Sequence, residues 1–248
     1  MPDTVTPTAP QRLRSVEAVL AENELGIYCV PRAAAHLPSA HQILNGRVWE
    51  PDTIRFITDH CGDRSIVHAG AFFGDMLPAL SRALAPGRRV YTAEPNHQNA
   101  ACVDWTIRMN GLKNVSFFRA AFGAQREITR IVVRNEDGSA RGGQSYLLRG
   151  DAPTQLAAEC LAQTLIVRID GIVQGDDVGV IHLDVEGHEP FALAGAMKTI
   201  KRCLPIVIVE THHPALWAHS YLAQLGYTAS PLKQLDGQNT IYMPGKRR

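Results

Sequence analysis

The 248-residue sequence has no long hydrophobic run and no excess of charge of either sign. No apolar stretch approaches the roughly 20 residues that a membrane-spanning helix needs. Lysine and arginine together number 25 and aspartate and glutamate 24, which gives a formal net charge of +1. A nearly neutral chain has no basic field with which to hold nucleic acid or an anionic membrane, so neither is expected as a partner.

Cysteine is scarce, and the N-terminal residues lack apolar character. The five cysteines are widely spaced and none forms a C-x-x-C pair, which argues against a zinc knuckle or a thioredoxin-like motif. Their odd number favours free thiols in a reducing compartment. The first ten residues, MPDTVTPTAP, have no apolar core of the kind found in a signal peptide. We therefore expect a cytoplasmic protein in which residues 1–14 form a disordered tail.

The sequence does contain short apolar strands that alternate with helices. The expected strands cover residues 65–70, 88–94, 114–120, 178–186, 205–211 and 239–244, and the expected helices cover residues 74–85, 96–111, 189–203 and 214–226. Such alternation predicts βαβ units, and hence an α/β core over residues 61–248 with a mostly parallel sheet and helices on both faces.

Two regions depart from this alternation. Residues 11–22 place apolar side chains at helical spacing and residues 50–60 predict another helix, so residues 15–60 are expected to form a helical cap on the core. Residues 124–170 are expected to form an inserted β-hairpin. The glycine-rich, charged loop at residues 135–145 is then a candidate lid that excludes water from the site.

The stretch VHAGAFFGDM, residues 67–76, joins the first core strand to the first core helix. Gly70 would allow a tight turn, and Gly74 would let a ligand lie against the backbone near the unpaired N–H groups of a helix N-terminus. The next strand ends in Glu94, whose two carboxylate oxygens match the spacing of the ribose hydroxyls. Because ligands of open α/β sheets bind beyond the carboxyl ends of the strands, this arrangement indicates a nucleoside site.

The spacing of the two glycines narrows the choice of nucleoside. The turn reads G-x-x-x-G instead of the G-x-G-x-x-G of a dinucleotide-binding fold, and no P-loop lysine follows it. A glycine turn and a ribose carboxylate without a phosphate cradle favour S-adenosylmethionine. Its amino-acid end would lie at the turn and its ribose on Glu94. Its adenine would lie near Ala120, Ala121 and Phe122.

Longer segments resemble a known family. Four segments resemble the FkbM family of S-adenosylmethionine-dependent methyltransferases, in a match that extends from about residue 49 to residue 211: WEPDTIRFI, HAGAFFGDMLPALSRAL, VYTAEPN and above all VIHLDVEGHEPFALAGAMKTIKRCLPIVIVET. The most specific part is D-V-E-G-x-E followed by a helix, a proline and an I-V-x-E strand. The resemblance implies a Rossmann-like class I methyltransferase fold with a seven-stranded sheet. It also implies methyl transfer, usually to an oxygen of a small molecule or glycan-like acceptor.

His68 departs from the family pattern. Family members usually carry at this position an acid that helps to bind the ammonium group of the cofactor. A histidine does not replace that acid as an anion, so Asp75 and Glu50 become candidates for the role. The complete set of predicted cofactor-binding residues is Glu50, His68, Gly70, Phe73, Gly74, Asp75, Glu94, Pro95, Asn96, Ala121, Phe122 and Asp184.

Methyl transfer from a sulfonium requires an aligned acceptor and a group that takes up the acceptor's proton. The motif HLDVEGHE ends the strand expected at residues 178–186, and VETHHP ends the strand expected at residues 205–211. Asp184 is the first choice for the base or acceptor-orienting group. Capping of the next helix is an alternative role for Glu186. The predicted catalytic residues are Asp184, Glu186, His188, Glu210 and His212.

The resemblance implies a methyltransferase that acts on a hydroxyl of a small natural-product or sugar-like acceptor, as in secondary metabolism. N-methylation, a Rossmann-type nucleotide-binding oxidoreductase and a non-catalytic module of the same fold are alternatives. No metal is expected, although Asp184, Glu210 and His212 form an alternative, oxygen-rich set of ligands for a divalent ion. The acceptor's identity and the oligomeric state, including a homo-oligomer, are left open by the sequence.

Overall fold

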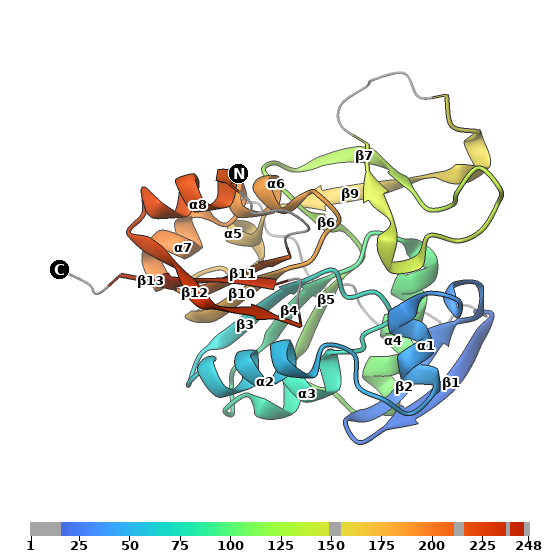
Figure 1. Cartoon of the computed structure of the whole chain (residues 1–248), viewed down its shortest axis with the longest axis horizontal. Helices are drawn as coiled ribbons and strands as arrows, with labels where there is room; N and C mark the ends of the chain where they lie inside the picture. The colour runs from blue at the N-terminus through green and yellow to red at the C-terminus, as the bar shows by residue number, and fades with distance from the viewer. Residues whose placement is uncertain (1–15, 149–154, 211–215, 237–238, 246–248) are drawn as a thin grey trace.

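The computed structural model describes residues 16–148, 155–210, 216–236 and 239–245. A seven-stranded sheet forms its centre, with the strand order β12-β13-β11-β10-β3-β4-β5 (Figure 1). These strands are β3 (Ser65–Ala69), β4 (Val90–Ala93), β5 (Val115–Phe118), β10 (Val178–Leu183), β11 (Ile206–Glu210), β12 (Tyr227–Leu235) and β13 (Asn239–Pro244). β13 pairs antiparallel with both of its neighbours, and the other pairs are parallel. The predicted α/β fold is confirmed, with a sheet that is mixed because of β13.

Helices cover both faces of this sheet (Figure 1). They are α2 (Pro51–His60), α3 (Leu77–Ala83), α4 (His97–Met109), α5 (Ile169–Ile172), α6 (Glu189–Ala194), α7 (Met197–Cys203) and α8 (Leu216–Ala223). Adjacent residues of β3 point to opposite faces, so Ile66 belongs to the same hydrophobic cluster as Ile57 of α2, whereas Val67 belongs to the cluster that contains Ile200 of α7. Every residue of β3 and β10 is buried, as expected for central strands covered on both sides.

The helix expected over residues 189–203 is two helices in the structure. α6 ends at Ala194 and α7 begins at Met197. Between them, Gly195 lies so close to the carbonyl oxygen of Gly123 that an added Cβ would be 2.0 Å from it. A continuous amphipathic pattern gives no sign of this tertiary contact.

The N-terminal cap differs from the expected pair of helices. The described part of residues 11–22 contains a strand, β1 (Ala18–Asn23), which pairs antiparallel with β2 (Gly26–Pro31), so the helix predicted there is wrong. The pairing places the buried side of β2 on α4, where the Cys29 N–H donates to Thr106 Oγ1 at 3.2 Å. This tertiary contact outweighs the local helical spacing. Two helices, α1 (Pro38–Leu44) and α2, complete the cap.

The insertion forms a second, four-stranded sheet with the order β6-β9-β7-β8. The predicted hairpin is confirmed, because β7 (Glu127–Val132) pairs antiparallel with β8 (Tyr146–Leu147). The sheet is completed by β6 (Ala121–Phe122) and β9 (Leu161–Val167), which the sequence pattern did not predict.

The segment expected to act as a lid packs against the cap. It contains a 3-10 helix, Gly142–Gln144. A Cβ on Gly142 would lie 2.5 Å from Leu37 and 2.8 Å from Ala34. None of the helices among the described residues combines the length and apolar character needed to cross a membrane.

Candidate active site

The turn after β3 and the loop after β10 meet at the carboxyl end of the sheet. Gly70 has a φ of 89°, and a Cβ there would be only 1.8 Å from the Asp184 carbonyl oxygen. The Asp184 N–H donates to the Ala69 carbonyl oxygen at 3.2 Å. Only glycine allows this approach, which brings the two loops together.

Gly74, the second glycine of the turn, has a different neighbourhood. Its φ is 87°, and a Cβ there would be 3.2 Å from the side chains of Leu77 and Thr106. Gly74 therefore contacts α3 and α4. Gly74 and Phe73 do not line either of the two cavities described below.

Glu94, which follows β4, is buried with both carboxylate oxygens engaged. One oxygen accepts from the Phe72 N–H at 2.9 Å, and the other accepts from the Asn96 N–H at 2.8 Å and Asn99 Nδ2 at 3.3 Å. Burial raises the pKa of Glu94 to about 8. These bonds hold the carboxyl group at the boundary between two cavities, both of which it lines.

The two cavities differ in polarity. They share Gly70, Glu94, Gly143, Asp184 and Glu186. The residues that line only the first cavity are mostly apolar: Ala69, Ala93, Pro95, Ala121, Phe122, Ser145, Leu147, Val185 and His188. The second cavity encloses about 950 Å³, including open solvent, and also extends to Trp49, Glu50, His68, Asp75 and Glu210. Most of the predicted cofactor-binding residues thus line one cavity or both.

The second cavity is strongly acidic. Six carboxyl groups line it, and its described lining residues include no lysine or arginine: the six are Glu50, Asp75, Glu94, Asp184, Glu186 and Glu210. Burial is the largest cause that raises the pKa of Glu50 to about 7 and that of Asp75 to about 7, and the charge of Asp75 adds to the effect on Glu50. Carboxyl groups with pKa values raised in this way can pair with a cationic ligand, which would in turn favour their ionised form.

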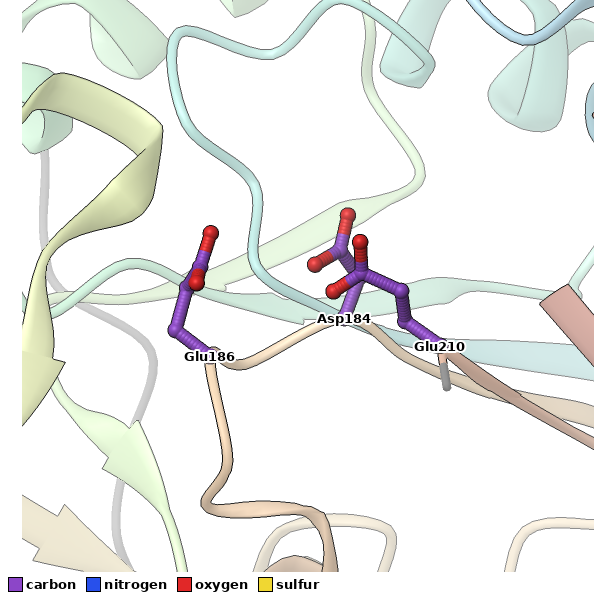
Figure 2. A group of neighbouring side chains, drawn as sticks. All are labelled: Asp184, Glu186 and Glu210. Atoms are coloured by element: carbon purple, nitrogen blue, oxygen red, sulfur yellow. The ribbon is translucent and has the colours of Figure 1, made fainter. Parts of the chain in front are cut away.

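Three of these carboxyl groups form a compact cluster. Figure 2 shows Asp184, Glu186 and Glu210 pointing the same way, with Asp184 and Glu210 side by side. Their oxygens can be chosen so that all lie within 4.8 Å of one another. Burial, followed by the charge of Glu210, raises the pKa of Asp184 well above its usual range.

The strand expected to run to residue 186 ends at Leu183. Glu186 has a φ of 54°, so it lies in a left-handed turn and not on the strand. This turn is closed by Glu189, whose carboxylate accepts from the Val185 and Gly187 N–H groups at 3.1 Å each. Glu189 therefore has the backbone-binding role, while Glu186 lines both cavities.

Two predicted histidines are placed differently. His188 is the N-cap residue of α6, stacks on Phe191 with ring centroids 4.8 Å apart, and lines the first cavity. His212 lies outside the described residues, so the structure provides no test of the alternative metal site that includes it. In the described part of the chain, the residue that joins Asp184 and Glu210 in a cluster of possible metal ligands is Glu186.

Asn239, at the start of β13, is not among the site residues predicted from the sequence. It donates to Glu50 Oε2 at 2.9 Å across 189 positions of the sequence. Its Oδ1 lies 3.4 Å from His182 Nε2, and His182 Nδ1 lies 3.0 Å from His68 Nδ1. The pairing of His68 with His182 follows from the neighbouring positions of β3 and β10, which only the strand order reveals.

Comparison with known proteins gives a family match. Residues 68–228, well over half of the chain, match the family described as the Methyltransferase FkbM domain. No curated protein matches the sequence. Among solved structures, the chain is similar to a methyltransferase FkbM from Methylobacillus flagellatus, with a TM-score of 0.50 and 19% identity over 73% of this chain and 43% of that one.

Two further structures are less similar. A tRNA (uracil-54, C5)-methyltransferase from Pyrococcus abyssi, in complex with S-adenosyl-L-homocysteine, has a TM-score of 0.45 and 10% identity, over 96% of this chain and 48% of that one. A SAM-dependent methyltransferase from Aquifex aeolicus has a TM-score of 0.44 and 13% identity, over 83% of this chain and 92% of that one. The chain spans less than half the length of the first two structures, and at these identities the likeness concerns the fold alone.

Proposed function

The chain belongs to the FkbM methyltransferase family, and on this basis we propose that it transfers the methyl group of S-adenosylmethionine to a hydroxyl of a small-molecule acceptor. The observation that carries the proposal is the pair of cavities of opposite polarity that meet at Glu94. An adenosyl sulfonium has the same division, because it joins an aromatic base to a cationic end through a ribose.

The apolar cavity suits the adenine ring. Ala121, Phe122 and Leu147 line it, and burial of a flat apolar surface against them favours binding by the hydrophobic effect. Glu94 at its edge would accept hydrogen bonds from the ribose hydroxyls. The cationic amino-acid end would then extend past Gly70 into the acidic cavity.

The carboxylate cluster would handle the acceptor's proton. When bound, S-adenosylmethionine supplies a methyl group already activated by the positive sulfur. Asp184, with its pKa raised by burial and by Glu210, is in its ionised form a stronger base than an exposed aspartate. We assign to Asp184 the uptake of the hydroxyl proton at a carboxylate oxygen, and to Glu186 and Glu210 the orientation of the acceptor.

An acceptor with several hydroxyls, such as a sugar-like or natural-product molecule, fits the lining of the second cavity. Carboxylates accept hydrogen bonds from hydroxyl groups and bind them with defined geometry. N-methylation is the other outcome that an acceptor screen would detect.

The proposal is tested by binding and turnover together. Calorimetry with S-adenosylmethionine and with NAD should show binding of the first only, and production of S-adenosylhomocysteine from a panel of hydroxylated and amino acceptors should identify the substrate. Asp184→Asn should retain cofactor affinity and lower turnover by roughly 10²–10⁴-fold, the usual contribution of a general base. The control is Asp59→Asn, which changes an exposed acid of α2.

Two results would contradict the proposal. Binding of NAD without binding of S-adenosylmethionine would favour the oxidoreductase alternative. Full turnover in Asp184→Asn would remove Asp184 from the chemistry and leave the cofactor assignment intact.

A further inference from the structure

A short segment of the insertion lines both cavities of the site. It consists of residues 142–147, called the strap below, and comprises the 3-10 helix Gly142–Gln144 and the strand β8. Gly143 lines both cavities, Gln144 lines the second cavity and Leu147 lines the first. The proposed adenine site and the proposed acceptor site are therefore bounded by the same piece of chain.

Asn99 of α4 connects the strap to Glu94. Its side-chain Nδ2 donates to Glu94 Oε1 at 3.3 Å and to the Gly142 carbonyl oxygen at 3.0 Å. An amide nitrogen carries two hydrogen atoms, so one Nδ2 can serve both acceptors. Asn99 is buried and lines neither cavity, so it can affect a bound ligand only through these two partners.

A second connection runs through Asn96 and Ser145. The Asn96 N–H donates to Glu94 Oε1 at 2.8 Å, and Asn96 Nδ2 donates to Ser145 Oγ at 3.0 Å. Ser145 Oγ in turn donates to the Gly142 carbonyl oxygen at 2.7 Å. Two asparagines of one turn thus hold the same end of the strap against the same carboxyl oxygen.

Phe72 supports the strap from the other oxygen of Glu94. The Phe72 N–H donates to Glu94 Oε2 at 2.9 Å, and Phe72 has a φ of 46°. A Cβ on Gly143 would lie 3.2 Å from the Phe72 ring, so the strap backbone lies directly on that ring. A bulky residue keeps a left-handed conformation only where its surroundings hold it there, and such residues are concentrated at functional sites.

We propose that Asn99 is a positioning residue that couples Glu94 to the strap, so that a cofactor bound at Glu94 also orders the wall of the acceptor site. The inference rests on the proposed function. Ribose hydroxyls bonded to Glu94 would restrain its carboxyl group, and Asn99 passes this restraint to the Gly142 carbonyl, because a buried amide that loses a partner pays its desolvation cost. A segment already ordered by one ligand costs the second ligand less to bind, so the acceptor binds better after the cofactor.

Hydrogen exchange followed by mass spectrometry tests the coupling on the full chain. In the wild-type protein, saturating S-adenosylhomocysteine should slow exchange in a peptide that covers residues 141–148 by roughly 3- to 10-fold, the range expected for one hydrogen bond. In Asn99→Leu this protection should be lost at saturating ligand, while exchange in α3 stays as in the wild type. Gln98→Leu, at the neighbouring half-buried position of α4, is the control.

The ratio of exchange rates with and without ligand separates coupling from structural support. If Asn99 only supports the fold, its loss speeds exchange of the strap in both states, and the ligand still protects the strap by the wild-type factor. Coupling requires the factor itself to fall. Asn99→Ser, whose hydroxyl is too short to span both acceptors, should reduce the factor in the same way and provides the comparison if Asn99→Leu does not fold.

The outcomes distinguish this inference from the proposed function. A wild-type protection factor in the Asn99 variants would overturn the inference and leave the cofactor assignment standing. The same holds if S-adenosylhomocysteine binds to the wild-type protein without slowing exchange in the strap. A wild-type protein that does not bind S-adenosylhomocysteine would overturn the proposed function itself, and the inference with it.

Discussion

The contact between Gly70 and Asp184 predicts that two chemically identical substitutions will have unequal effects. Gly70 and Gly87 have nearly the same backbone conformation, with φ values of 89° and 85°. A Cβ at Gly87 would meet nothing within 4 Å, whereas one at Gly70 would be 1.8 Å from the Asp184 carbonyl oxygen. Gly87→Ala therefore measures the cost of the backbone conformation alone, and Gly70→Ala adds the steric clash.

The two costs can be worked out separately. A left-handed conformation costs a non-glycine residue about 1–2 kcal/mol, and this applies to both variants. At Gly70 the Asp184 carbonyl must also retreat by at least 1.2 Å, the difference between 1.8 Å and the 3.0 Å below which real Cβ atoms have essentially no contacts. Overpacking of this kind adds about 1–3 kcal/mol. We expect Gly87→Ala to lower the free energy of unfolding by about 1–2 kcal/mol and Gly70→Ala by about 2–5 kcal/mol.

Urea unfolding followed by circular dichroism would measure both differences, with midpoints compared at equal slope. Gly70→Ala should also lower turnover under conditions in which it is fully folded, because a shift of the Asp184 backbone displaces the carboxyl group of that residue. Gly87→Ala should keep wild-type turnover. Equal unfolding midpoints for the two variants would refute the argument that the turn after β3 and the loop after β10 are in contact.

Three further predictions concern the carboxyl groups of the site. Glu94→Gln leaves either the Phe72 N–H or the Asn96 N–H without its acceptor. Calorimetry should show that it weakens binding of S-adenosylhomocysteine by about 1–3 kcal/mol. Unchanged affinity would exclude Glu94 as the group that binds the ribose hydroxyls. Burial raises the pKa of Glu50 to about 7 and that of Glu94 to about 8, both from 4.5, so the folded state binds protons that the unfolded chain has released. This stabilisation is present below pH 4.5 and is lost as the pH rises through 7 to 8. The urea midpoint of the ligand-free protein should therefore be lower at pH 8.5 than at pH 5.5. A higher midpoint at pH 8.5 would contradict this prediction. Turnover should persist in EDTA, because no metal is expected; a loss that Mg²⁺ or Mn²⁺ restores would instead assign the three-carboxylate cluster to a metal ion.

The core of the fold could be predicted because each of its elements leaves a local pattern. Short apolar runs such as PIVIV and the glycine turn after residue 69 identify strands and a strand-to-helix connection without knowledge of their neighbours. The predictions from sequence are wrong where a contact with a distant part of the chain determines the local structure. Val16, Val19 and Leu20 have helical spacing, but Val19 and Leu20 lie in a strand that pairs with β2, and Leu20 is 67% exposed.

In the site, too, residues that follow from local patterns can be predicted, and residues placed by distant contacts cannot. Glu94 and Asp184 stand at the ends of predictable strands, so their positions near the cavities follow from the general architecture of a parallel sheet. The partners of His68 do not follow in this way. They require the register between β3 and β10 and a contact between Glu50 and Asn239, residues near opposite ends of the chain, and neither leaves a periodic signal in the sequence.

The polarity of the two cavities also restricts how the proposed cofactor can be oriented. With adenine in the first cavity, the amino-acid end would reach the carboxyl groups of the second. In the reverse orientation the ammonium group would face mainly the apolar side chains of Ala121, Phe122 and Leu147. The ammonium group would have three carboxyl groups near it there, against six in the second cavity, so the forward orientation pairs its charge better. In the forward orientation the acceptor would share the second cavity with Asp184 and Glu210, the two carboxyl groups that lie side by side in Figure 2.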